Sequence, residues 1–366
     1  MKINSNGLLE IAEKLFKKIK VKTLVDKVIP KLNQNKIKGQ NGVVGVIGGS
    51  FEYCGAPYYS AVSALKSGVD LSHVFCHVDA AIPIKSYSPE LIVHPGFDNN
   101  IENKELLKKT CRWFKSMDVL VYGPGMGREE PTPLIFDLLL TESMKLREII
   151  HILDADALWH FIHSKNYEMY VNEIPFFIVT PNITEYGRMH KMFFGQDIND
   201  NQNNFTLDDL LSIIKLEEDQ IILFDDLNKL ELDNPQVFNL FKKEIQLTIF
   251  LKNKILVKKG KVDIITDGSA IYLVSNRGSQ KRCGGLGDIL GGVISAFCAM
   301  VKKEFDKSYE IEINNKTIME AIALASYICR LSSEHAYSKH GYSLTAPDVI
   351  NELSKIAKDY EIPLQI

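Results

Sequence analysis

A glycine-rich run that ends in an aspartate is the part of this sequence best suited to chemistry. The run reads Lys281-Arg282-Cys283-Gly284-Gly285-Leu286-Gly287-Asp288, and the apolar segment 289–297 follows it. Glycines just before a helix let successive backbone amides point at one anion, and the helix dipole favours negative charge there. An aspartate at that helix start does not help to hold phosphate, but it can take a proton from a hydroxyl group that is being phosphorylated. The run therefore indicates phosphoryl transfer with Asp288 as the base.

The charged and reactive residues of this run also have plainer interpretations. Asp288 is of a type that caps helices. Lys281 and Arg282 either neutralise the charge of a transferring phosphoryl group or form a solvated basic turn. Cys283 has no activating partner nearby in the sequence, so we expect a packed thiol and not a nucleophile.

Glycine, aspartate or asparagine follows four of the predicted strands. The four turns are Gly48-Gly49-Ser50, Gly123-Pro124-Gly125-Met126-Gly127, Asp154-Ala155-Asp156 and Pro181-Asn182. Because ligands of open parallel sheets bind outside the carboxyl ends of the strands, we expect these turns to form the rim of one site. The sequence contains neither a G-x-G-x-x-G fingerprint at these turns nor a G-x-x-x-x-G-K-[ST] loop, so it supports neither a Rossmann dehydrogenase nor a P-loop enzyme.

Two further segments carry polar side chains in useful positions. In Asn182-Ile183-Thr184-Glu185, the amide and the carboxylate can share one face of a starting helix, where they suit a hydrated Mg²⁺. The alternative is a helix cap with a stabilising glutamate in the first turn. Lys259-Gly260-Lys261-Val262-Asp263 has the pattern of a charged turn between two strands.

Short apolar strands alternate with helices beyond residue 42. Strands are predicted at 43–47, 74–78, 119–122, 149–153 and 176–179, and helices at 56–67 and 132–146. Three strands then form a hairpin-like region, and helices close the chain: strands at 255–257, 263–266 and 271–274, helices at 287–301, at 317–337 and after Thr345. This order predicts an α/β fold of three layers, with a mainly parallel central sheet and helices on both faces.

The bulk composition predicts a globular protein without a nucleic-acid or membrane partner. Hydrophobic residues make up 45% and charged residues 24% of the 366 residues, and the formal charge is −3. A chain without basic surplus has no electrostatic reason to bind nucleic acid, and no apolar run approaches the length of a membrane span. The six cysteines have no zinc spacing and fit a reducing compartment, so we expect a cytoplasmic protein.

The N-terminal segment predicts an amphipathic helix over residues 8–19. Glu10 and Glu13 argue against a mitochondrial presequence, which makes import by this helix the less favoured alternative. We therefore divide the chain into an N-terminal helical segment, 1–37, and a single catalytic domain, 38–366. The polar segments 195–205 and 227–250 are interpreted as surface insertions on that domain.

Taken in order, these motifs resemble the ribokinase-like superfamily, in which Gly-x-Gly-Asp supplies an anion hole and a catalytic base. More closely, the sequence is similar to the eukaryotic ATP-dependent NAD(P)H-hydrate dehydratases, from about residue 38 to residue 348. The matching stretches are 46–50, 55–58, 88–91, 123–128, 154–159, 180–188, 259–263 and 281–285. The sequence departs from the family at Ala157, where glycine is common, and at Leu286, where glutamine is common.

The resemblance implies repair of damaged nicotinamide cofactor, in which ATP is spent to remove the hydroxyl of hydrated NADH or NADPH. It implies ATP as co-substrate, Mg²⁺ as cofactor and Asp288 as the base beside an anion hole at Gly285 and Gly287. The residues implied to contact the hydrate are Gly127, Asn182, Ile183, Thr184, Glu185, Tyr186, Gly187, Arg188 and Asp288. Those implied to bind ATP are Lys259, Gly260, Lys261, Val262, Asp263, Gly278, Ser279, Gln280, Lys281, Arg282, Cys283, Gly284, Gly285, Leu286 and Gly287.

Two other functions are compatible with the same motifs. A ribokinase-like kinase of a small alcohol would share the chemistry of Asp288 but keep a phosphorylated product. A non-catalytic nucleotide-binding regulator would have no need to retain Asp288, Asn182 and Glu185 together.

The Mg²⁺ ligands expected in this protein are Asn182 and Glu185. The sequence leaves homo-oligomerisation and the choice between hydrated NADH and hydrated NADPH open.

Overall fold

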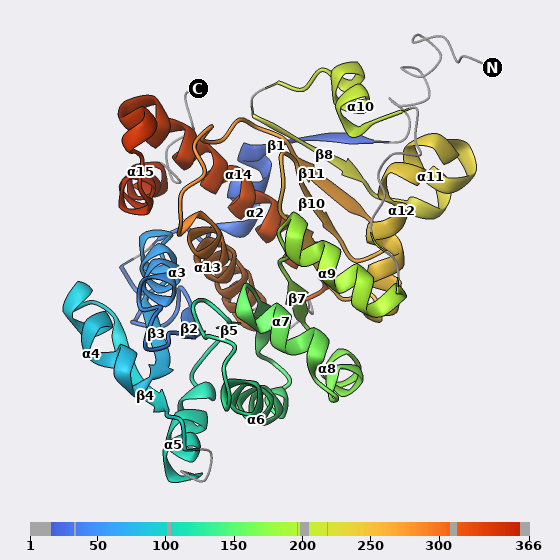
Figure 1. Cartoon of the computed structure of the whole chain (residues 1–366). Helices are drawn as coiled ribbons and strands as arrows, with labels where there is room; N and C mark the ends of the chain where they lie inside the picture. Colours follow the sequence, from blue (N-terminus) through green and yellow to red (C-terminus); the bar gives the residue numbers. More distant parts are fainter. Residues whose placement is uncertain are drawn as a thin grey trace.

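One mixed sheet runs through the molecule, with helices on both of its faces (Figure 1). The computed structural model describes residues 16–32, 34–100, 104–195, 197, 205–217, 219–307 and 313–358. In this part of the chain the sheet has eleven strands, in the order β1-β8-β11-β10-β9-β7-β6-β5-β2-β3-β4. The seven strands from β9 to β4 are parallel to one another, and the pairs from β9 to β1 are antiparallel.

The strands are short, as expected for buried parallel strands of an α/β sheet. The parallel strands are β2 (Val43–Ile47), β3 (Leu71–His77), β4 (Ile92–Phe97), β5 (Val119–Tyr122), β6 (Ile150–Leu153), β7 (Phe177–Val179) and β9 (Ile255–Lys258). The antiparallel strands are β1 (Lys17–Lys20), β8 (Gln220–Phe224), β10 (Asp263–Thr266) and β11 (Ile271–Val274).

The helices divide between the two faces because successive strand residues point to opposite sides. Val119 and Val121 of β5 pack into one core, and Leu120 and Tyr122 pack into the other. The first core lies under α2 (Val21–Val28), α3 (Gly55–Lys66), α4 (Val78–Tyr87), α13 (Leu286–Lys307), α14 (Asn315–His340) and α15 (Ala346–Lys358).

The second face carries the remaining helices. They are α5 (Lys104–Phe114), α6 (Thr132–Met144), α7 (Asp156–His163), α8 (Tyr167–Glu173) and α9 (Ile183–Phe194). Over the antiparallel strands a third apolar cluster packs beneath α10 (Leu207–Ile214), α11 (Leu227–Asp233) and α12 (Pro235–Phe250). The predicted α/β fold of three layers with a mainly parallel sheet is confirmed.

The predicted N-terminal helix is wrong over its last residues. Lys17–Lys20 forms β1, which pairs antiparallel with β8, and the first described helix, α2, begins at Val21. Residues 1–15 lie outside the described residues, as does most of the polar segment 195–205. The segment 227–250 forms α11 and α12. The division at residue 37 and the interpretation of these segments as insertions stay predictions.

The long helix α13 is the element that presents the glycine-rich run to the rest of the molecule. It lies between α3 and α14 in Figure 1 and contacts both. A Cβ at Gly292 would lie 2.1 Å from the carbonyl oxygen of Ser60, so glycine is needed where α13 crosses α3. Within the described ranges, no helix combines the length and apolar character needed to cross a bilayer.

Candidate active site

The carboxyl ends of β2, β5, β6 and β7 meet at one edge of the sheet, because these strands are parallel neighbours. Glycines let the turns after them touch. Gly123 has a φ of +113°, and a Cβ there would lie 1.9 Å from the carbonyl oxygen of Asp154. At Gly48 the added atom would lie 2.1 Å from the carbonyl oxygen of Pro124. The structure thus brings together the turns that were expected to form one rim.

Asp154, at the end of β6, is the most buried carboxylate of this rim, with 2% of its surface exposed. Its Oδ1 accepts hydrogen bonds from Lys259 Nζ at 2.6 Å and from Thr180 Oγ1 at 2.8 Å. Lys259 follows β9, and its backbone amide donates to Pro181 O at 2.9 Å. A buried carboxylate needs such donors, and these contacts together join the ends of β6, β7 and β9.

Asp288 lies in the first turn of α13 and is partly buried beside this ion pair. Burial raises the pKa of Asp288 to about 7; the Asp154 and Asp156 carboxylates also raise it, and Lys259 lowers it. The helix start leaves backbone amides without intrahelical partners, and the positive φ of Gly285, +94°, turns the chain into the helix there. A carboxyl with a pKa near neutrality is suited to accept a proton at physiological pH. These surroundings fit the role of a base better than that of a simple helix cap.

Lys259 is the cation of the cluster. Burial lowers its pKa, but the Asp154, Glu185 and Asp288 carboxylates outweigh this effect, and the net pKa is raised. The ammonium lies 3.7 Å from the position that a Cβ would take at Gly287. Lys259 therefore stays charged at the start of α13.

A second carboxylate after β6 organises the turn that follows β5. Asp156 accepts a hydrogen bond from Gly127 N at 3.0 Å and one from Arg128 Nε at 2.7 Å. His160 Nε2 donates to Gly127 O at 2.8 Å. Gly127, which was predicted to contact the substrate, is thus held through both its amide and its carbonyl group.

Asn182 and Glu185 form a capping box at the start of α9. Asn182 Oδ1 accepts from the amides of Thr184 and Glu185 at 3.0 Å, and Glu185 Oε2 accepts from Asn182 N at 2.8 Å. Burial raises the pKa of Glu185, against the effect of the Lys259 ammonium. The helix-cap interpretation therefore describes the first contacts of both side chains. In the described part of the chain, no group of three or more His, Cys, Asp or Glu side chains has the arrangement of a metal site.

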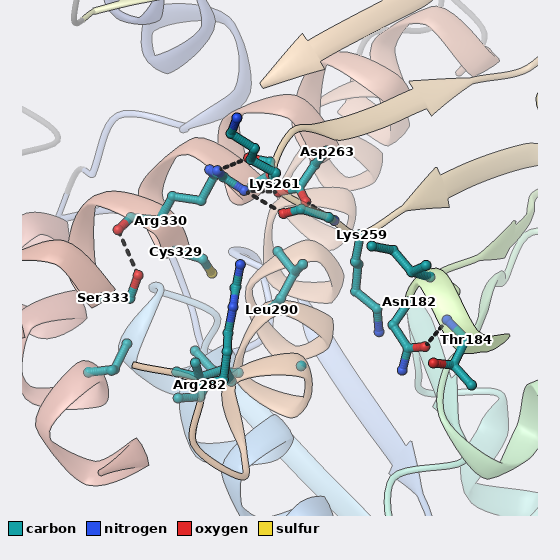
Figure 2. Close-up of a pocket in the computed structure, with 17 residues that line it drawn as sticks. Asn182, Thr184, Lys259, Lys261, Asp263, Arg282, Leu290, Cys329, Arg330 and Ser333 are labelled. Carbon is teal, nitrogen blue, oxygen red and sulfur yellow. Dashed lines mark hydrogen bonds and ion pairs between the residues drawn. The ribbon is translucent and has the colours of Figure 1, made fainter. Parts of the chain in front are cut away.

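A cavity of about 470 Å³ lies between α9, the start of α13 and α14 (Figure 2). Its lining includes Lys259, Gly260, Lys261, Asp263, Arg282, Leu286 and Gly287, all predicted to bind ATP. Asn182, Ile183 and Thr184 line it from α9. Both residues that flank Asp288, Gly287 and Ile289, are also in the lining. The cavity therefore joins the basic turn after β9 to the start of the helix that carries Asp288.

Helix α14 contributes lining residues that sequence reasoning missed: Ser326, Cys329, Arg330 and Ser333. Arg330 donates to Gly260 O at 3.3 Å, to Asp263 Oδ2 at 3.2 Å and to the carbonyl oxygen of Lys261. Ser326 Oγ donates to the same Asp263 carboxylate. Ser326 and Arg330 lie more than sixty positions beyond the turn they hold, and the sequence shows only that the four residues share the spacing of one helix face.

The two cations of the glycine-rich run have different surroundings. Lys281 Nζ donates to the carbonyl oxygens of Tyr342 and Leu344, at 2.5 and 2.8 Å. The exposed Arg282 side chain instead extends into the cavity from below α14 in Figure 2. Of the two, Arg282 is placed to meet an anion in the cavity.

The remaining residues predicted to bind ATP shape the loop or lie behind it. Ser279 N donates to Ser333 Oγ at 3.0 Å, and Tyr337 OH donates to Gln280 Oε1 at 3.3 Å. Gly278 packs beside Ser333, and Val262 is buried in the third apolar cluster. Burial raises the pKa of the Cys283 thiol, in keeping with a packed cysteine. Gly284 and Gly285 precede the first turn of α13.

The residues of α9 that were predicted to contact the hydrate lie in different surroundings. Tyr186 is buried beneath the helix, and Lys258 Nζ lies 4.6 Å from the centre of its ring. Gly187 and Arg188 line a second cavity of about 360 Å³, together with Lys191 and Lys258. Ile183 and Thr184 line both cavities. The contacts of these residues with a ligand stay predictions.

Comparison with known proteins gives a consistent result over most of the chain. The family model described as NAD(P)H-hydrate dehydratase matches residues 44–236 and 221–355. The ATP-dependent (S)-NAD(P)H-hydrate dehydratase of Danio rerio is 35% identical over 341 residues, which are 92% of this chain and 87% of the relative. The protein of the same name from Arabidopsis thaliana is 34% identical over 344 residues, 91% and 82% of the two chains.

Solved structures show the same fold at lower identity. A ribokinase-like superfamily protein from Enterococcus faecalis has a TM-score of 0.65 and 20% identity, and the match covers 93% of this chain and 94% of the other. The ADP/ATP-dependent NAD(P)H-hydrate dehydratase from Bacillus subtilis, co-crystallised with ATP and Mg²⁺, has a TM-score of 0.60 and 17% identity, with 93% and 97% covered. The fold is ribokinase-like, the resemblance found in the sequence is confirmed, and the chain belongs to the NAD(P)H-hydrate dehydratase family.

Proposed function

We propose that this protein uses ATP to dehydrate hydrated NADH or NADPH, and so returns the damaged cofactor to its reduced form. The observation that carries the proposal is the position of Asp288: a carboxyl with a pKa of about 7, at a helix start and between two lining residues of a basic cavity. Family membership, with relatives named for this ATP-dependent reaction, supports the choice of substrate.

The residues provide each part of a balanced reaction. Asp288 takes the proton from the ring hydroxyl, whose oxygen forms a bond to the γ-phosphorus of ATP while the bond to ADP breaks. The ring nitrogen then donates its electron pair as the carbon–oxygen bond breaks and phosphate leaves. Loss of a proton from the neighbouring ring carbon restores the double bond. Phosphate is a far better leaving group than hydroxide, which explains why ATP is needed.

The cavity is proposed to hold the nucleotide. Lys259, Arg282 and the amides at the start of α13 would meet its phosphates, since cations and helix N-termini stabilise phosphoryl charge. A hydrated Mg²⁺ needs only one or two protein oxygens beside the phosphates. The second carboxylate oxygen of Glu185 fits that demand, and the ion would neutralise phosphate charge. Asn182 Oδ1 already accepts from two backbone amides of α9, so it would have to leave the helix cap to bind the ion. We expect the reaction to occur in the cytoplasm, in keeping with six free cysteines.

The test is product analysis with the purified protein, ATP, Mg²⁺ and hydrated NADH. The proposal predicts NADH, ADP and free phosphate in equal amounts, seen by absorbance of reduced nicotinamide and by mass spectrometry. A stable phosphoester of the substrate would show a small-molecule kinase instead. ATP binding without turnover of the hydrate would show a nucleotide-binding regulator.

A further inference from the structure

The buried carboxylate of Asp154 has no direct part in the proposed reaction. Its Oδ1 is held by Lys259 and Thr180, at 2.6 and 2.8 Å. On the other side, Oδ2 lies 3.4 Å from the position that a Cβ would take at Gly291 of α13. These contacts fix the carboxylate between the sheet and the helix that carries Asp288. A buried charge that only completes the packing is costly, because it loses its hydration, so Asp154 needs a compensating role.

Lys259 is the group on which Asp154 acts. The side chain of a lysine is flexible, and its ammonium is a compact charge that pairs with whichever carboxylate is nearest. Three carboxylates surround this ammonium: Asp154, Glu185 and Asp288. Of these, Asp154 accepts its hydrogen bond, and the ammonium reaches the cavity beside Gly287.

We propose that Asp154 is a positioning residue for the dehydration, an inference that rests on the proposed function. It holds the Lys259 ammonium where the transferred phosphoryl group is expected, and it keeps that ammonium from closing an ion pair with Asp288. Without Asp154, Lys259 is drawn to Asp288, which makes the base weaker and moves the cation away from the phosphate.

Other charged and titratable groups surround this position from each neighbouring element. Asp156 after β6 acts on Asp288, and Arg128 after β5 acts on Glu185 of α9. The adjoining cavity adds Lys261 after β9, Asp263 on β10, Arg282 before α13 and Arg330 on α14. Tyr59 on α3 lies beside Gly285, and Asp348 on α15 acts on Cys283. Among them, Asp154 is the largest carboxylate contribution that raises the pKa of Asp288, and Lys259 is the contribution that lowers it most. Substitutions of these two residues therefore move the ionisation of Asp288 in opposite directions.

The experiment measures kcat and the pH dependence of kcat/KM for the hydrate at saturating ATP, for the wild type, D154N, K259M and the double variant. We expect D154N to lose about tenfold or more in kcat and to move the acid limb of the profile to lower pH by about 0.5 unit or more. K259M should move that limb to higher pH. In the double variant kcat should be no lower than in K259M alone, because Asp154 acts through Lys259.

Two results would overturn the inference: an acid limb that stays in place in D154N, or losses in kcat that add in the double variant. The double variant removes both partners of the ion pair between Lys259 and Asp154, so it keeps the test valid if D154N does not fold. D118N is the matched control, since the buried Asp118 pairs with Lys302 and Lys303 at the opposite end of β5; its kcat and acid limb should be unchanged. A wild-type protein without ATP-dependent recovery of NADH would instead refute the proposed function itself.

Discussion

Two opposing effects of its surroundings set the ionisation of Asp288. A carboxylate at a helix N-terminus is usually favourable for the helix, but burial beside Asp154 and Asp156 makes this one costly to ionise. Its type and position in the run could be predicted from the sequence. The surroundings that raise its pKa could not, because Asp154, Asp156 and Lys259 are distant in the chain and meet only in the folded sheet.

The ionisation of Asp288 predicts the pH dependence of the reaction. A base must be deprotonated to act, so kcat/KM for the hydrate should rise with pH and level off above about pH 7. The measurement is a rate profile from pH 5.5 to 9, with ATP affinity measured over the same range to separate ionisation of the nucleotide. A flat profile below pH 7 would show that Asp288 is not the group that loses the proton.

The same ionisation predicts a stability effect of D288N. Because the folded pKa is raised above its ordinary value, the unfolded chain releases the proton first, and the contribution of Asp288 to stability falls as pH rises from about 4 to about 7. At pH 8 the neutral amide should therefore raise the free energy of unfolding by about 1–3 kcal/mol. Denaturant unfolding at pH 8 and at pH 4 tests this, and the gain should vanish at the lower pH.

Among the helices and strands, the short apolar strands and the glycine turns after them could be predicted from the sequence. The charged strand β1, at one edge of the sheet, could not. The strands β2, β5, β6 and β7 are short apolar runs, and each was predicted. The sequence of β1 is Lys-Lys-Ile-Lys, and its single apolar residue also fits the helical pattern predicted for residues 8–19. The segment forms a strand because it pairs with β8. β4 contains Pro95 and Gly96, residues that are rare within strands, and it lies at the edge of the sheet where they are tolerated.

The close crossing of α13 and α3 predicts a large difference between two glycine substitutions. G292A places a Cβ 2.1 Å from Ser60 O and should destabilise the fold by about 2 kcal/mol or more, since backbone atoms must move apart. G187A is the matched control: it lies in helix α9, with nothing within 4 Å of the added atom, and should be neutral or stabilising by about 0.5–1 kcal/mol. Equal unfolding curves for the two variants would contradict this account of helix packing.

For the whole molecule, the site is an assembly of segments from nearly the entire described chain. The rim comes from turns that the sequence reveals one by one, and the order of these and the other motifs along the chain carried the family resemblance. The cavity wall on α14 was missed, because nothing in the sequence shows that Arg330 reaches back to the turn after β9. Long-range contacts of this kind are set by how helices pack on the sheet.

Binding of ATP to the folded protein predicts a rise in thermal stability. A ligand that binds only the native state stabilises it by about 2.7 kcal/mol at a hundred times its Kd. R282A should reduce the ATP-induced shift in Tm, because its guanidinium extends into the cavity. K281A is the matched control, since the Lys281 ammonium binds the carbonyls of Tyr342 and Leu344; its ATP-induced shift should be retained. Equal shifts in both variants would place the phosphates elsewhere.

The most direct test of the account compares the wild type with D288N in ATP-dependent recovery of NADH from its hydrate at pH 8. We expect the wild type to restore the absorbance of reduced nicotinamide, and D288N to show no recovery above background while it unfolds cooperatively and keeps its Tm shift with ATP. Turnover by D288N at a rate comparable to the wild type would contradict the assignment of Asp288 as the base.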